Sequence, residues 1–69
     1  MTTETIGNWA GLVWNALNEA KALDIKEIKK TTKLREKDVT AALGWLAREN
    51  KISFQAVEGQ KDVIVTLVD

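Results

Sequence analysis

Basic side chains gather in one short stretch of this 69-residue chain. Residues 25–37 carry a net charge of +4, from two glutamates and six basic residues, namely Lys26, Lys29, Lys30, Lys33, Arg35 and Lys37. Such a cluster either forms a solvated helix surface or presents cationic groups to phosphates, the interaction that dominates nucleic-acid binding. The whole chain has ten basic and ten acidic residues, and this zero net charge is less typical of nucleic-acid binders, which are more often basic.

Other kinds of chemistry find little support in the composition. The chain has neither cysteine nor histidine, which excludes disulfides, the usual zinc ligands, a thiol nucleophile and a histidine base. Ser53, the threonines and the scattered carboxylates form no plausible nucleophile–base pair, and no glycine-rich phosphate loop is present. The sequence therefore predicts no enzymatic activity, cofactor, metal site or small-molecule substrate. Lack of cysteine fits a reducing cytoplasm, and no apolar run has the length of a signal peptide or membrane span.

The stretch from residue 34 to 52 is the clearest helix signal. Apolar residues recur there at three- and four-residue spacing, which predicts a helix from about Arg35 to Glu49 with one buried face. That face carries Val39, Ala42, Leu43 and Leu46, and the opposite face carries Lys37, Thr40, Ala41, Gly44 and Arg48. A glycine inside a helix costs roughly 1 kcal/mol against alanine. Gly44 therefore indicates close approach of a groove edge, a partner helix or the Trp45 ring.

A longer helix is expected from Thr2 to Lys21, with Thr2 or Thr3 as its N-cap. Its apolar stripe consists of Ile6, Trp9, Ala10, Val13, Ala16, Leu17 and Ala20. Leu12 and Trp14 fall on the two flanks of this stripe. These flanks either complete the core beneath the hairpin or meet a second subunit, and the second alternative predicts a homodimer.

Between these two helices, Asp24 and Glu27 have the spacing of a capping box. They predict a short helix over residues 25–31, with Ile25 and Ile28 facing inward, followed by a turn over residues 31–33. A short strand is expected near Ala22 and Leu23.

The C-terminal residues alternate in the manner of a β-hairpin, with strands over 51–57 and 62–68 and a loop that contains Gly59. The alternation places six residues on one face, namely Ile52, Phe54, Ala56, Val63, Val65 and Leu67. The opposite face includes Ile64 and Val68. It is half apolar, so a partner can cover it as well.

This order of elements resembles the winged helix-turn-helix superfamily over nearly the whole chain. The pattern LDIKEIKKTTKLREKDVTAALGWLARENKI carries the resemblance, because its core positions are occupied by Leu23, Ile28, Leu34, Val39, Leu43, Leu46 and Ile52. The short chain and the tryptophan-rich first helix look more narrowly like a family of small stand-alone winged helix-turn-helix proteins, known mainly as a domain of unknown function. The resemblance implies one α+β domain over residues 1–69, with three helices and a C-terminal hairpin wing.

In DNA-binding relatives the third helix enters the major groove and the wing touches the flanking backbone. Carried over by position, the residues facing base edges would be Glu36, Lys37, Thr40, Ala41 and Gly44. Those approaching phosphates would be Lys29, Lys30, Lys33, Arg35 and Arg48, with Lys61 at the wing tip. This chain departs from the pattern in two ways: the helix face lacks the Arg, Asn and Gln residues that make bidentate base contacts, and the wing tip, EGQKD, is not basic.

Two functions therefore remain open at the level of sequence. The first is a winged-helix DNA-binding protein acting as a small transcriptional regulator. The second is a protein-interaction or dimerisation module on the same fold, with a surface formed by Leu12, Trp14, Ile64 and Val68.

Overall fold

The computed structural model describes residues 2–56, 58–59 and 63–68. Over these residues the chain forms three helices and three strands, in the order α1, β1, α2, α3, β2, β3. The helices are α1 (Thr3–Ala20), α2 (Ile25–Thr32) and α3 (Glu36–Arg48), and the strands are β1 (Ala22–Asp24), β2 (Ile52–Gln55) and β3 (Ile64–Leu67). The expected α+β arrangement is confirmed, including the short first strand.

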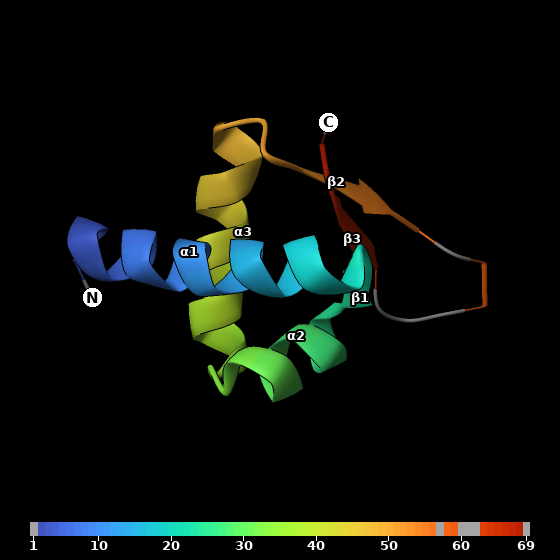
Figure 1. Ribbon diagram of the computed structural model, residues 1–69, viewed down its shortest axis with the longest axis horizontal. Coiled ribbons are helices and arrows are strands. Elements are labelled where there is room, and N and C mark those ends of the chain that lie inside the picture. The colour runs from blue at the N-terminus through green and yellow to red at the C-terminus, as the bar shows by residue number, and fades with distance from the viewer. Residues whose placement is uncertain (1, 57, 60–62, 69) are drawn as a thin grey trace.

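The three strands form one antiparallel sheet in the order β1-β3-β2. The central strand β3 pairs with β1 so that Leu23 lies opposite Val65, and with β2 so that Phe54 lies opposite Val65. Because β1 lies between α1 and α2 in the chain, this pairing ties the last strand to the helical part of the domain (Figure 1). Val57, Lys61 and Asp62, which the hairpin prediction included, lie outside the described residues.

Local hydrogen bonds define where the helices begin. Thr2 caps α1, because its Oγ1 accepts from the Thr5 backbone N–H at 3.1 Å. The predicted capping box begins α2, where Asp24 Oδ1 accepts from the Glu27 N–H at 2.8 Å and Glu27 Oε1 accepts from the Asp24 N–H at 3.0 Å. Arg35 precedes α3 without a side-chain capping bond.

Residues with a positive φ stand at or just beyond the end of each helix. Lys21 follows α1 with φ 74°, Lys33 follows α2 with φ 62°, and Asn50, which the sequence marked as a left-handed stop, has φ 58° two residues beyond α3. The predicted turn at residues 31–33 is shorter than expected, because Thr31 and Thr32 belong to α2. The Thr32 hydroxyl donates to the Ile28 carbonyl at 2.7 Å and accepts from the Leu34 N–H at 3.3 Å, which closes the α2–α3 turn.

The core lies where α1 crosses α3, with α2 and the sheet closing its remaining sides (Figure 1). Its buried members come from all six elements: Ala10, Val13, Ala16, Leu17, Leu23, Ile28, Val39, Ala42, Leu43, Leu46, Ile52 and Val65. Leu34 is only half-buried and packs against this cluster from the α2–α3 turn. The periodicity of α3 is thus confirmed, since its four apolar stripe residues all face inward.

Three residues expected on apolar inner faces are exposed. Ala20, in the last turn of α1, and Ala56, just after β2, both contact solvent. Phe54 lies opposite the buried Val65 and so shares its face of the sheet, yet it is 46% exposed. The reason is that β2 is an edge strand that runs away from α3 (Figure 1), so the helices that cover Val65 do not extend over Phe54.

Candidate nucleic-acid interface

The face of α3 opposite the core is exposed along its length. Lys37, Thr40, Gly44 and Arg48 are exposed and Ala41 is half-buried, while the other face of α3 packs into the core behind α1 (Figure 1). The α3 face, as we call these five residues, follows the three- and four-residue spacing that aligns side chains on a helix. The residues that the sequence assigned to base edges and to one flanking phosphate contact therefore share one surface, except Glu36.

The two ends of the α3 face are cationic and its middle is small and uncharged. Lys37 and Arg48 are eleven residues apart, which corresponds to about 16 Å along the helix axis. A major groove is about 12 Å wide, so this spacing allows the two cations to reach phosphates beyond the groove edges while Thr40, Ala41 and Gly44 lie between them. Within the described part of the chain, neither Lys37 nor Arg48 forms a salt bridge.

Glu36 does not point along the α3 face as an independent group. Its Oε1 lies 3.6 Å from the Nζ of Lys29, so the pair links α2 to the first turn of α3 across the helix-turn-helix. The Lys29 side chain is 38% exposed and that of Glu36 is 73% exposed, and pairs of such exposure contribute only ~0–1 kcal/mol. The pair therefore neutralises Lys29 locally, but it does little to hold the fold together.

Arg35 is also engaged by a carboxylate. Its Nε donates to Asp38 Oδ2 at 3.4 Å, and the Asp38 side chain is buried in the first turn of α3. Asp38 Oδ1 has no hydrogen-bond partner among the described residues. Sequence reasoning assigned Asp38 to the helix dipole, and its burial beside Arg35 was missed, because only the packing of the neighbouring elements buries it.

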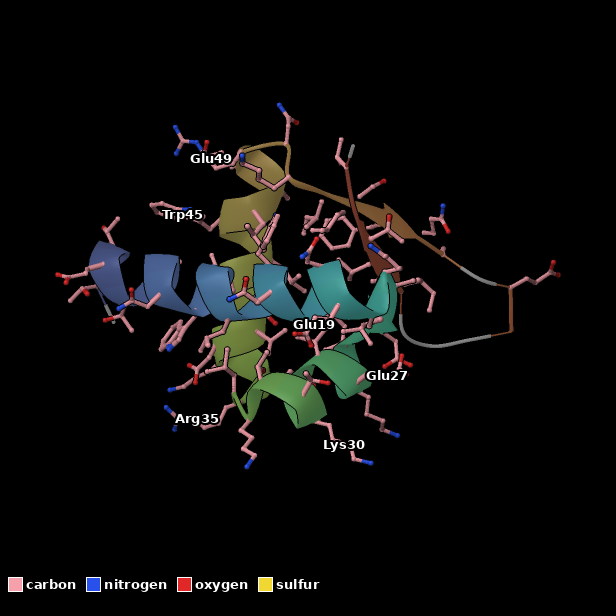
Figure 2. All side chains as sticks on the ribbon, in the orientation of Figure 1. Glu19, Glu27, Lys30, Arg35, Trp45 and Glu49 are labelled. Carbon is pink, nitrogen blue, oxygen red and sulfur yellow. The ribbon has the colours of Figure 1, made fainter. Side chains whose placement is uncertain are left out.

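The remaining cations of the basic stretch lie on α2 and in the turn that follows it. Lys30 and Lys33 are exposed, and neither has a salt-bridge partner in residues 2–56, 58–59 and 63–68. Figure 2 shows the Lys30 and Arg35 side chains both extending away from α1. Lys61, the predicted wing-tip contact, lies outside the described residues.

Trp45 borders the α3 face and was not assigned to it from the sequence. It lies one turn from both Ala41 and Arg48, is 38% exposed, and projects sideways from α3 (Figure 2). A helical projection of residues 35–49 already contains this signal, since position 45 falls on the border between the buried and exposed stripes. The exposure of this ring gives the α3 face one aromatic edge.

The proposed interaction residues do not form one surface. Leu12 is 48% exposed and Trp14 is 38% exposed, and two positions of a helix are about 200° apart, so they project from opposite flanks of α1. Ile64 is half-buried and Val68 is 49% exposed, and both lie on the sheet face opposite Val65. The structure thus distributes this set over three regions.

Three helices, with the third exposed along one face, and an antiparallel sheet that ends in a hairpin define a winged helix-turn-helix domain. The chain belongs to the family described as winged helix-turn-helix domain (DUF2582), whose model matches residues 1–67. None of the proteins with curated functions matches the chain. Among residues 2–56, 58–59 and 63–68, no helix is long and apolar enough to cross a bilayer.

Two solved structures resemble the domain. One is the solution NMR structure of protein BT2368 from Bacteroides thetaiotaomicron, which is 36% identical, with a TM-score of 0.86 over 97% of this chain and 79% of that chain. The other is the crystal structure of a mutant MarR from E. coli complexed with operator DNA, which is 19% identical, with a TM-score of 0.76 over 99% of this chain and 46% of that chain. The MarR likeness concerns the fold alone.

Proposed function

We propose that this domain binds duplex DNA through the α3 face and acts as a small cytoplasmic transcriptional regulator, by binding rather than by catalysis. The observation that carries the proposal is the arrangement of the third helix of a winged helix-turn-helix fold. It is exposed, it has a cation at each end, and its middle is small enough for a groove to come close. The MarR structure supports the proposal because that protein, of similar fold, is bound to operator DNA.

Each part of the basic stretch has a role in this proposal. The α3 face lies in the major groove, with Lys37 and Arg48 at the phosphates on its two sides. Lys30 and Lys33 contact the backbone beside α2, where they add sequence-independent affinity. Arg35 and Lys29 contribute less, because Asp38 and Glu36 already offset their charges. Lys61 supplies a further phosphate contact from the wing.

A titration of the protein with duplex DNA at several salt concentrations tests the proposal. We expect binding at 50 mM salt with a dissociation constant in or below the range of ~10⁻⁴–10⁻⁶ M that non-specific binders reach, and affinity that falls linearly on a log–log plot against salt. No binding at tens of micromolar protein in 50 mM salt would overturn it. Fluorescence polarisation of a labelled duplex suits this measurement.

A second function, a protein-interaction or homodimerisation module, is favoured by one observation. Leu12, Trp14 and Val68 are large apolar side chains that the chain itself leaves exposed. This alternative predicts self-association with little dependence on salt. Sedimentation of the same samples separates the two, and a dimer that still binds DNA would combine them, with two α3 faces about 34 Å apart.

The Lys29–Glu36 pair gives a prediction in which binding improves. Glu36→Gln removes a negative charge beside the α3 face and releases Lys29 for a phosphate, so we expect severalfold tighter DNA binding at 50 mM salt. The slope of log affinity against log salt should steepen by about 0.9, the contribution of one added phosphate contact. Glu19→Gln makes the same charge change on α1 and serves as the control. Equal gains in the two variants would mean that only net charge matters.

A further inference from the structure

Thr40 stands in the middle of the α3 face with its hydroxyl proton already in use. Its Oγ1 donates to the Glu36 carbonyl at 2.8 Å, one turn earlier in the helix. A hydroxyl has a single proton, so Thr40 cannot also donate to a base edge while this bond is present. What the exposed side chain still offers to a ligand is a methyl group and an accepting oxygen.

The neighbours of Thr40 on this face offer no hydrogen-bonding side chain at all. Ala41 presents a single methyl group, and Gly44 presents backbone. An ideal Cβ built on Gly44 would meet nothing within 4 Å, neighbouring residues and its own helix backbone aside, so packing within the described chain does not require a glycine there. The only donors on the face are therefore those at its two ends, Lys37 and Arg48.

We propose that the middle of the α3 face reads the C5 methyl groups of thymine in the major groove, through the side-chain methyls of Thr40 and Ala41. This inference rests on the proposed DNA binding and assigns its sequence preference. Thymine is the one standard base with a methyl group on its major-groove edge, and alanine and the threonine methyl are the side-chain groups that contact it. Gly44 allows the helix to sit deep enough for these short side chains to reach the bases.

The decisive comparison changes the DNA and leaves the protein intact. Duplexes with a random core are first enriched by binding to the protein, and the selected sequence is then synthesised with thymine or with uracil at each T position. Uracil lacks only the methyl group, so charge and base pairing are kept. We expect selected sites that contain thymine, and about fourfold weaker binding for each contacted methyl that is removed.

Thr40→Ser then tests the assigned residue. Serine keeps an oxygen that can bond to the Glu36 carbonyl and removes only the methyl, so the thymine-to-uracil affinity ratio should fall toward one. Thr31→Ser, at an exposed position of α2, should leave the ratio unchanged. DNA binding with equal affinity for the thymine and uracil duplexes would overturn this inference while leaving the proposed function standing. Failure to bind either duplex would overturn the proposed function, and this inference with it.

Discussion

Leu17→Ala should remove most of the stability of this domain. Leu17 is fully buried in α1 against the core, and leucine-to-alanine changes at such sites cost about 2.7–5 kcal/mol, through lost transfer free energy and the cavity left behind. A chain of this length has a total free energy of unfolding of roughly 3–10 kcal/mol. We therefore expect the urea midpoint, followed by far-ultraviolet circular dichroism, to fall by about 2 M or more, or the variant to be unfolded in water.

Leu12→Ala provides the matched control for this prediction. It is the same substitution in the same helix, so intrinsic helix propensity contributes equally to both variants and cancels in the comparison. Leu12 is 48% exposed, and a surface change of this kind should alter the free energy of unfolding by no more than about 0.5 kcal/mol. A large loss in Leu12→Ala that depends on protein concentration would instead show that this side chain is buried between subunits.

Reversal of the charges at Lys30 and Lys33 should weaken DNA binding more than any other pair of surface changes outside the α3 face. Both side chains are exposed, and neither has a salt-bridge partner in the described part of the chain. Each lost phosphate contact removes about 0.9 from the slope of log affinity against log salt, so Lys30→Glu with Lys33→Glu should bind roughly 100-fold more weakly at 50 mM salt. The loss should be similar for all DNA sequences, because phosphate contacts carry no sequence information.

The control for this pair keeps the composition and net charge identical. Lys21→Glu with Lys51→Glu makes the same change at two exposed positions outside the basic stretch. If DNA lies against α2 and α3, this control should lose much less affinity than the first double variant, and its salt slope should stay near that of the original chain. Equal losses would contradict the placement of DNA on α2, since they would reflect net charge alone.

Much of the fold follows from interactions between residues close together in sequence. The Asp24–Glu27 capping box, the positive φ at Asn50 and the buried stripe of α3 were all predicted, because each depends on side chains within about one turn of each other. The exposure of the α3 face follows from the same periodicity. For this reason the sequence alone was enough to indicate the winged helix-turn-helix arrangement.

Tertiary structure decided what depends on residues distant in the chain. Phe54 has the alternation of a core residue, but the helices do not reach over the edge strand that carries it, so it is exposed. The charge of Lys29 is offset because the turn brings α2 beside the first turn of α3, where Glu36 lies. Local sequence determines which face of an element is apolar. Which part of that face is covered, and which charges are neutralised, is settled only when the elements pack together.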